Sequence, residues 1–239
     1  MKINKLYTYP KSMRSVINGG RHYDIDGDKL PSVTTILSAC QSDEKKASLA
    51  AWKTRMGDKA ADEVRDTAAA RGTAMHTYLE HYLDGTGYKD LTTLGKQAEV
   101  MANKIIEAGL GDLEELWGLE TTLYYPDLYA GATDVVGVYA GQPAIIDFKQ
   151  SNKPKRREWI LDYFEQLGAY AMAHNQVYGT EIQSGIVLMC TKDFLFQKFE
   201  VSGREFVRHQ HAFLRKVDQY YKNVSQAKQG QDTKNDQKV

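Results

Sequence analysis

The pattern of apolar and polar positions divides the chain into a mainly helical first part and a strand-rich second part. Residues 43–84 are rich in Ala, Lys, Glu, Asp and Met and hold no proline, which predicts two helices broken near Gly57. Residues 94–109 predict another helix. Before these, residues 21–30 indicate a hairpin, and residues 31–37 a short helix that starts at a Ser or Thr cap.

After residue 109 the pattern changes to short segments rich in Thr, Tyr, Val and Ile between Pro and Gly turns, which is typical of strands. Three of them predict an antiparallel meander: 116–125, 129–139 and 144–149. The elements predicted after the meander are a helix, two strands and a final amphipathic helix: 158–178, 182–190, 194–201 and 202–221. The polar residues 223–239 predict a disordered tail.

Three acidic residues fall at matching places on the meander. If both turns are symmetric hairpins, Glu120 lies beside Asp134, and Asp134 beside Asp147. Cross-strand partners share one face of a sheet with Cβ atoms about 5 Å apart. Lys149 follows Asp147 by two residues and points to the same side.

A row of three like charges destabilises a sheet unless positive charge lies among them, and a divalent cation such as Mg²⁺ is the simplest solution. The alternative is that these acids lie on the solvated face of an antiparallel sheet. Lys149 favours the first interpretation, because a lysine beside a carboxylate-bound metal helps to deprotonate water or to stabilise charge on a phosphate. That is the chemistry of metal-assisted phosphodiester hydrolysis.

Length and composition bound the architecture. The 239 residues, 42% of them hydrophobic, suffice for one core, so we expect a single domain over 1–222 with its sheet core at 116–202. No apolar run approaches the roughly 18 residues that span a bilayer, and no apolar segment follows the basic N-terminus, so we expect a cytoplasmic protein without membrane contact. Cys40 and Cys190 are too few for a disulfide framework or a four-cysteine metal site and are interpreted as ordinary buried residues.

Charge is informative only locally. The 31 basic and 31 acidic residues cancel, which excludes only a uniformly basic nucleic-acid binder. Residues 105–148 hold eight acids and no Lys or Arg, whereas residues 149–157 hold five basic residues and no acid. Such a reversal is typical of a cation site beside an anion track.

Four short motifs resemble the PD-(D/E)XK nucleases of the RecB-like exonuclease branch. Ile145–Lys149 is similar to the strand that ends in D-x-K, and Gly131–Asp134 to the preceding G-x-x-D strand. Gly72–His76 resembles the upstream G-x-x-x-H, and Gln166–Tyr170 the downstream Q-x-x-x-Y. The resemblance implies an α/β (α+β) fold, with a restriction-endonuclease-like core whose mixed central sheet is flanked by helices.

Within this branch the nearer resemblance is to the mitochondrial genome maintenance exonucleases and related phage exonucleases. Pro31–Thr34 and Ala51–Met56 resemble that group's N-terminal segment and its W-K-x-R-M helix. By this resemblance residues 43–84 form an arch over the active site through which a single strand threads. The chain leaves no room for a mitochondrial presequence with extra N-terminal structure and lacks the cysteine cluster of iron-sulfur relatives, which favours a phage or bacterial enzyme.

The resemblance also implies residue roles. His76, Asp134, Asp147 and the Phe148 carbonyl would ligate Mg²⁺ or Mn²⁺, and Lys149 would be the catalytic lysine. His76 alone is more often a structural histidine, but its companion motifs reverse that interpretation.

Three further residues are candidates for the catalytic group. Glu120 matches the acid on the first strand of the family's core, so the resemblance implies that it would be an outer metal contact or an orienter of ligands. Gln166 and Tyr170, one helical turn apart, position the substrate phosphate or Lys149.

Several basic residues are candidate phosphate contacts. The run after the catalytic strand is usually a solvated loop and also resembles a nuclear import signal, but its position favours phosphate binding. Most basic residues of 43–84 are interpreted as a charged helical surface, with Lys53 and Arg55 the best candidates for DNA contacts. The predicted DNA-binding residues are Lys53, Arg55, Arg71, Lys153, Lys155, Arg156 and Arg157.

The sequence therefore predicts a metal-dependent DNA exonuclease that acts on single-stranded DNA or DNA ends in phage or bacterial replication, recombination or degradation. DNA is the expected partner, with a single-strand-binding or annealing protein as a further candidate. Two alternatives stay open: a structure-specific endonuclease or RNA-processing enzyme on the same core, and a module that binds DNA ends without cutting them.

Overall fold

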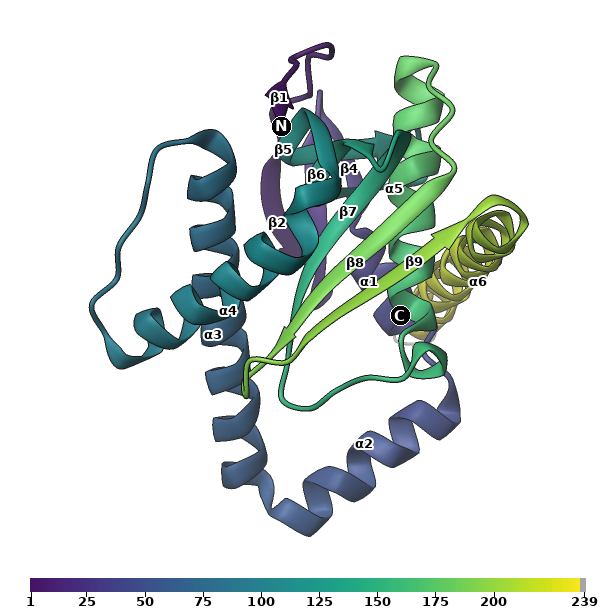
Figure 1. Ribbon diagram of the computed structural model, residues 1–239. Helices are drawn as coiled ribbons and strands as arrows, with labels where there is room; N and C mark the ends of the chain where they lie inside the picture. Colours follow the sequence, from purple (N-terminus) through teal and green to yellow (C-terminus); the bar gives the residue numbers. More distant parts are fainter. Residues whose placement is uncertain (237–239) are drawn as a thin grey trace.

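The computed structural model describes the backbone of residues 1–236 and the side chains of residues 1–227 and 229. Six strands form a mixed sheet in the order β1-β5-β6-β7-β8-β9, and three form a small antiparallel sheet, β2-β3-β4 (Figure 1). The strands are β1 (Lys2–Ile3), β2 (Met13–Ile17), β3 (Gly20–Ile25), β4 (Asp28–Pro31), β5 (Leu113–Tyr125), β6 (Tyr129–Tyr139), β7 (Gln142–Ser151), β8 (Ser184–Thr191) and β9 (Phe196–Ser202).

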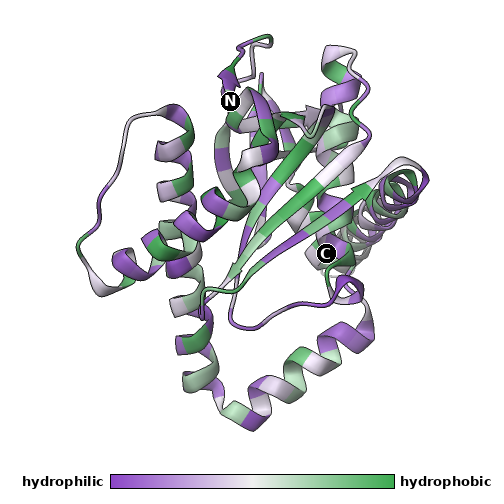
Figure 2. Cartoon of the chain, in the orientation of Figure 1, coloured by the Kyte–Doolittle hydropathy of each residue, from purple (hydrophilic) through white to green (hydrophobic). Residues whose placement is uncertain are grey.

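Helices cover both faces of the six-stranded sheet. The helices are α1 (Val33–Ala39), α2 (Asp43–Met56), α3 (Asp58–Asp84), α4 (Thr93–Gly109), α5 (Leu161–Tyr178) and α6 (Gly203–Asp236), with short 3-10 turns η1 (Leu110–Asp112) and η2 (Arg157–Trp159). One apolar core joins α3 and α4 to the sheet, and another joins α1, α5 and α6 to it. Because both faces are buried, neighbouring residues such as Ile145 and Ile146 are both apolar, and β8 is largely green in Figure 2.

Polar caps and glycines set the helix boundaries as the sequence predicted. The Ser32 hydroxyl accepts a hydrogen bond from the Thr35 amide at the start of α1, and Ser42 caps α2 in the same way. Gly57, with a φ of 80°, separates α2 from α3. Gly85 ends α3 in the left-handed conformation that a glycine adopts without a Cβ clash.

The predicted strand register is confirmed. In the antiparallel β5–β6 pair, Leu119 lies opposite Val135 and Thr121 opposite Thr133, which places Glu120 beside Asp134. In β6–β7, Val135 lies opposite Ile146. The helix α5 then connects β7 to β8, which pair in parallel. The structure thus has the mixed central sheet flanked by helices that the predicted fold class requires.

Two parts of the chain differ from the expectation. The sequence did not predict β1 and β2, which are short and largely exposed. The final helix, expected to end near Tyr221, runs to Asp236, because residues 222–236 contain no proline and lack a strong helix terminator. The backbone of residues 223–236, where most of the predicted disordered tail falls, is helical, and residues 237–239 lie outside the described residues.

The division into one domain over 1–222 and a tail stays a prediction. Within the described part of the chain, no helix is both long and apolar enough to cross a bilayer.

The N-terminal segment packs against the end of α5 around the buried His174. The Thr180 hydroxyl donates to the Asn175 side-chain oxygen and so accepts from His174 Nδ1, 2.8 Å away. His174 Nε2 is therefore unprotonated and accepts from the Tyr9 hydroxyl at 3.2 Å. Burial lowers the pKa of His174 to about 4. The neutral imidazole is thus part of the packing.

We expect this histidine to make the fold sensitive to mild acid. The unfolded chain protonates His174 near the ordinary histidine pKa of 6.5 and the folded chain only near 4, so stability is complete above 6.5 and falls as the pH drops toward 4. The loss attributable to His174 should reach about 2 kcal/mol at about pH 5, where the unfolded chain is protonated and the folded chain is not. Urea unfolding of the wild type and His174→Gln at several pH values measures it. The His174→Gln variant should lose less stability on acidification. A His211→Gln control, altered at an exposed histidine, should match the wild type. If the free energy of unfolding of all three proteins changes equally with pH, the prediction is contradicted.

Candidate active site

The candidate site lies where β6 and β7 separate. The β6–β7 register extends from Tyr139 and Gln142 to Val135 and Ile146, one step short of Asp134 and Asp147. In place of a further ladder bond, Asp134 Oδ2 accepts a hydrogen bond of 2.6 Å from the Phe148 amide. Asp134 and Asp147 are both buried. The separation allows side chains from helices on both faces of the sheet to reach the carboxylates.

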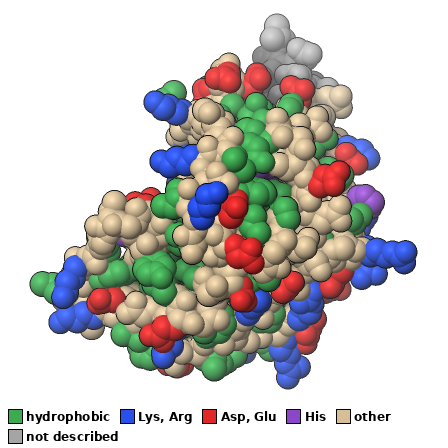
Figure 3. Space-filling model, turned by 45° about the horizontal axis from the view of Figure 1, so that its top comes forward, with side chains coloured by type: hydrophobic (Ala, Val, Ile, Leu, Met, Phe, Trp, Pro, Cys, Tyr) green, Lys and Arg blue, Asp and Glu red, His purple; other side chains and the backbone are tan. Residues whose placement is uncertain are grey.

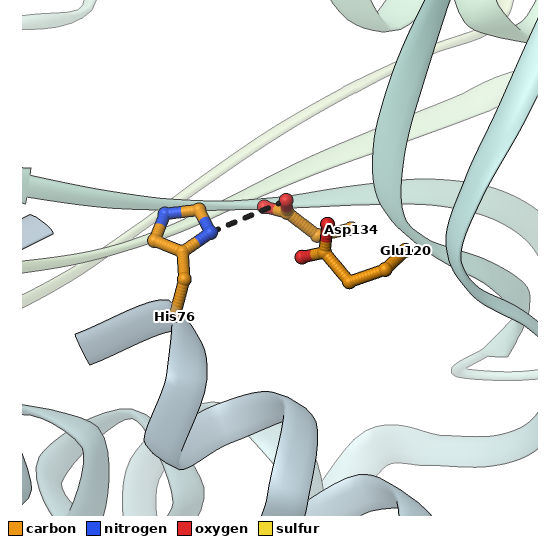
Figure 4. Close-up of side chains that lie close together, drawn as sticks. All are labelled: His76, Glu120 and Asp134. Carbon is orange, nitrogen blue, oxygen red and sulfur yellow. Dashed lines mark ion pairs between the residues drawn. The ribbon is translucent and has the colours of Figure 1, made fainter. Parts of the chain in front are cut away.

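His76 reaches the carboxylates from α3. Its Nδ1 lies 3.3 Å from Asp134 Oδ1, and one donor atom each of His76, Glu120 and Asp134 lie within 4.8 Å of one another (Figure 4). Glu120 has a φ of 48°, a left-handed conformation that is unfavourable for a residue with a Cβ. The chain therefore accepts local strain at a residue whose carboxylate points into this group.

Asp147 is turned toward Lys149 rather than toward His76. Its Oδ2 lies 2.5 Å from Lys149 Nζ, and its Oδ1 accepts a hydrogen bond of 3.3 Å from Gln166 Nε2. Oδ2 is buried and has the Lys149 ion pair but no hydrogen bond of good geometry. Gln166 also donates to the Tyr170 hydroxyl oxygen at 3.3 Å. The two α5 residues thus hold the Asp147 carboxylate in place.

The electrostatics of the site couple these groups. Desolvation opposes the charge on His76, but the Asp134 carboxylate outweighs it and raises the pKa of His76 to about 9. Desolvation also acts against ionised Asp134, yet His76 and Lys149 hold the pKa of Asp134 below its usual value. His76 and Lys149 therefore both interact favourably with the carboxylate row.

The two remaining carboxyl groups have raised pKa values. Glu120 is exposed as a residue, but desolvation of its carboxyl group and repulsion by Asp134 raise its pKa to about 7. Burial raises the pKa of Asp147 to about 6, although Lys149 counteracts the shift. Desolvation would lower the pKa of Lys149, but Asp147 and Asp134 raise it well above its usual value. Lys149 is therefore a cation at neutral pH.

Glycines at two motif positions allow close packing around the site. A Cβ on Gly72 would lie 3.1 Å from Gln150 Cγ, so this glycine leaves space where α3 meets β7. A Cβ on Gly131 would lie 2.8 Å from the Tyr170 ring. Phe148 contributes its amide and a ring whose centroid lies 6.1 Å from that of His76. Its role as a carbonyl ligand stays a prediction.

Arg71 requires a correction. It was predicted to contact DNA, but it is only 5% exposed, and its guanidinium donates to the side-chain oxygens of Gln150 (3.1 Å) and Asn152. Burial lowers its pKa. The sequence shows the charge of this arginine but not its burial. In the structure Arg71 connects α3 to the end of β7.

The basic loop after β7 divides into exposed and engaged residues. Lys153 and Arg156 are exposed and Lys155 is half-buried. Arg157 lies 2.9 Å from a Glu205 carboxylate oxygen and donates to the Glu200 carbonyl at 2.8 Å. Arg157 thus holds the loop against β9 and α6. The sequence analysis predicted a phosphate contact for Arg157 but not these contacts within the protein.

The helix α2 carries the other predicted DNA contacts. None of its residues is buried, and Lys53 Nζ lies 3.4 Å from the Asp58 carboxylate. Arg55 is exposed and lines a cavity of about 660 Å³ together with Trp52. At its other end α2 meets α5 through an ion pair of 2.7 Å between Lys45 and Asp162. The helix therefore spans from α5 to α3, while its role as an arch stays a prediction.

Sequence reasoning missed the groove beside the site. It has a volume of about 1140 Å³ and is lined by Lys149, Gln166, Lys45 and Lys216 among others. Lys45 was interpreted only as part of a charged helical surface. Its partner Asp162 is 117 residues away in the sequence, a separation at which no local pattern predicts a contact.

Comparison with known proteins shows that the chain is similar in sequence to exonucleases. No family model matches. The chain is 29% identical over 178 residues to mitochondrial genome maintenance exonuclease 1 of Xenopus tropicalis, and 29% identical over 177 residues to the same protein of Homo sapiens. The resemblance inferred from the sequence is confirmed. The matches cover 69% of this chain, which spans about half the length of the mitochondrial genome maintenance exonucleases, 49% and 50%.

A solved structure of a protein from Eubacterium rectale, provisionally described as an exonuclease, is also similar. It is 16% identical, with a TM-score of 0.49, and the match covers 67% of this chain and 68% of that one.

Proposed function

We propose that the chain is a metal-dependent DNA exonuclease that hydrolyses phosphodiester bonds on single-stranded DNA or at DNA ends. The observation that carries the proposal is the gathering of His76, Glu120 and Asp134 beside the buried Asp147–Lys149 ion pair. These groups come from α3, β5, β6 and β7 and meet where the β6–β7 ladder ends. The similarity to the mitochondrial genome maintenance exonucleases supports the same activity.

The donor set fits a hard divalent cation. One imidazole nitrogen and carboxylate oxygens lie close enough to share one ion, and such ligands suit Mg²⁺ or Mn²⁺. Of the proposed ligands, His76 and Asp134 belong to this group. Asp147, which pairs with Lys149, and the Phe148 carbonyl would complete the set, with Glu120 as an outer contact or orienting group. When bound, the cation polarises a phosphoryl oxygen and makes an attacking water more acidic.

The chain's own residues supply the remaining chemistry. Lys149 carries a positive charge and stabilises the negative charge that builds on the phosphate. Asp147 keeps Lys149 Nζ at 2.5 Å, and Gln166 orients the other oxygen of that carboxylate. Tyr170 in turn accepts from Gln166 and fixes its amide. The products, by analogy with the family, carry a 5′-phosphate and a 3′-hydroxyl.

Two DNA topologies distinguish this function from its alternatives. End-labelled linear single-stranded DNA should be degraded in Mg²⁺ or Mn²⁺ and persist in EDTA, whereas covalently closed single-stranded circles should persist in all conditions. Opening of the circles would show a structure-specific endonuclease on the same fold. Binding of linear DNA without any cleavage, in a preparation supplied with either metal, would favour the non-cleaving module.

The cellular setting follows from the resemblance to phage exonucleases. We propose that the enzyme acts in phage or bacterial DNA replication, recombination or degradation, in the cytoplasm of the bacterial host cell. A single-strand-binding or annealing protein is the candidate partner, since both would act on the same single strands.

A further inference from the structure

The groove beside the candidate site leads from Lys149 toward the start of α2. Lys149 and Gln166 line one part of it, and Gln41 and Lys45 another. The start of α5 lies across from the start of α2, and the ion pair between Lys45 and Asp162 joins the two helices (Figure 1). A DNA strand with a phosphate at Lys149 could therefore continue along this groove.

The groove offers no excess of positive charge to such a strand. Four lysines and four acidic residues line it. On the face shown in Figure 3, acidic and basic side chains are likewise interspersed. Three of the lysines have a carboxylate partner: Lys45 with Asp162 at 2.7 Å, Lys149 with Asp147 at 2.5 Å and Lys216 with Glu165 at 2.5 Å. Phosphate attraction is thus a weak source of affinity here, and another interaction has to supply it.

Two aromatic side chains line the groove, and only one of them is open to a ligand. The Tyr163 ring lies 5.1 Å from Lys149 Nζ and is half-buried. Trp159 is 55% exposed, and its amide donates to the Arg156 carbonyl in the turn η2. The Arg156 guanidinium lies 5.2 Å from the centroid of the Trp159 ring. A large apolar ring is thereby presented to the groove on a hydrogen-bonded turn.

We propose that Trp159 stacks on an unpaired DNA base and positions the strand in this groove. The inference rests on the proposed function and adds to it the residue that holds the strand. Stacking suits a neutral groove because every base has a π-face, so that affinity comes without sequence preference and without a large excess of positive charge. The exposed Arg156 beside the ring is placed to contact the phosphate next to the stacked base.

Binding of labelled single-stranded DNA in EDTA, where cleavage does not interfere, tests the role of Trp159 on the full chain. Trp159→Ala should bind about tenfold more weakly, and Trp159→Phe should retain most of the affinity. An abasic site moved along the oligonucleotide should weaken wild-type binding about tenfold at one position and should weaken Trp159→Ala no further there. The loss in Trp159→Ala should persist at raised salt, whereas any loss in Arg156→Ala should shrink.

Leu161→Ala is the matched control, since Leu161 lines the same groove and is 46% exposed but has no aromatic ring. It should bind DNA like the wild type. Wild-type affinity in Trp159→Ala, an equal loss in Leu161→Ala, or abasic losses that are the same with and without Trp159 would overturn the proposal. Cleavage by the wild type is measured separately. A protein that binds through Trp159 but never cuts would refute the nuclease assignment alone, and one that cuts without using Trp159 would refute the stacking alone.

Discussion

Lys149→Ala should lower the rate of DNA cleavage about a thousandfold while leaving the fold intact. The lysine is charged at neutral pH and lies 2.5 Å from Asp147 Oδ2, at the position where charge on a bound phosphate needs a counterion. Its removal leaves Asp147 without its cationic partner. That carboxyl already has a pKa raised to about 6 by burial, so it can take up a proton instead of remaining as a buried charge.

The measurement combines cleavage of end-labelled linear DNA with binding in EDTA and with thermal unfolding. Lys149→Ala should bind DNA within a few-fold of the wild type, because Trp159 and the other residues that line the groove are unchanged. Lys104→Ala is the control, since Lys104 lies on α4 and pairs with the exposed Glu107 of the same helix. A Lys149→Ala protein that cuts DNA at the wild-type rate in a clean preparation would refute the role of this lysine.

Local sequence signals predicted the part of the site that lies on the meander. The connection from β5 to β6 has three residues, 126–128, and the one from β6 to β7 has two, Ala140 and Gly141; positive φ values at Asp127, Ala140 and Gly141 close both turns, and the index sums of the paired strands then fix the register. That register places Glu120, Asp134 and Asp147 on adjacent strands. The same signals could not show that the β6–β7 ladder ends at Val135 and Ile146. The divergence depends on a hydrogen bond from the Phe148 amide to a side chain, not on strand propensity.

Other features depend on contacts between segments far apart in the sequence. Arg71 has the composition of a surface residue, yet α3 packs it against Gln150 and Asn152, 79 and 81 residues away. The family motif identified His76, and α3 places its Nδ1 3.3 Å from Asp134 Oδ1, a contact between residues 58 positions apart that no local pattern predicts. The sequence places Trp159, Tyr163 and Phe164 after the basic run, but it does not show which of these rings is exposed. The structure buries Phe164 and leaves Trp159 55% exposed beside the groove.

Asp134→Asn should abolish metal-dependent cleavage, with a fall of about a thousandfold, and should also remove stabilisation of the fold by Mn²⁺. Asp134 accepts from Phe148 through Oδ2 and lies 3.3 Å from His76 through Oδ1, so it connects the strand to the imidazole. Asparagine keeps an oxygen that can accept from the Phe148 amide, and the fold should therefore persist. It lacks the negative charge that a divalent cation requires.

Thermal unfolding in EDTA and in increasing Mn²⁺ separates metal binding from catalysis. A cation at about a hundred times its dissociation constant stabilises the folded wild type by about 2.7 kcal/mol, which raises the unfolding temperature by about 5 °C or more for a chain of this size. Asp134→Asn should show no such rise. Asp127→Asn makes the same chemical change in the exposed turn between β5 and β6 and should behave like the wild type. If Mn²⁺ stabilises Asp134→Asn as strongly as the wild type, Asp134 is not a ligand, and the cation binds elsewhere on the chain.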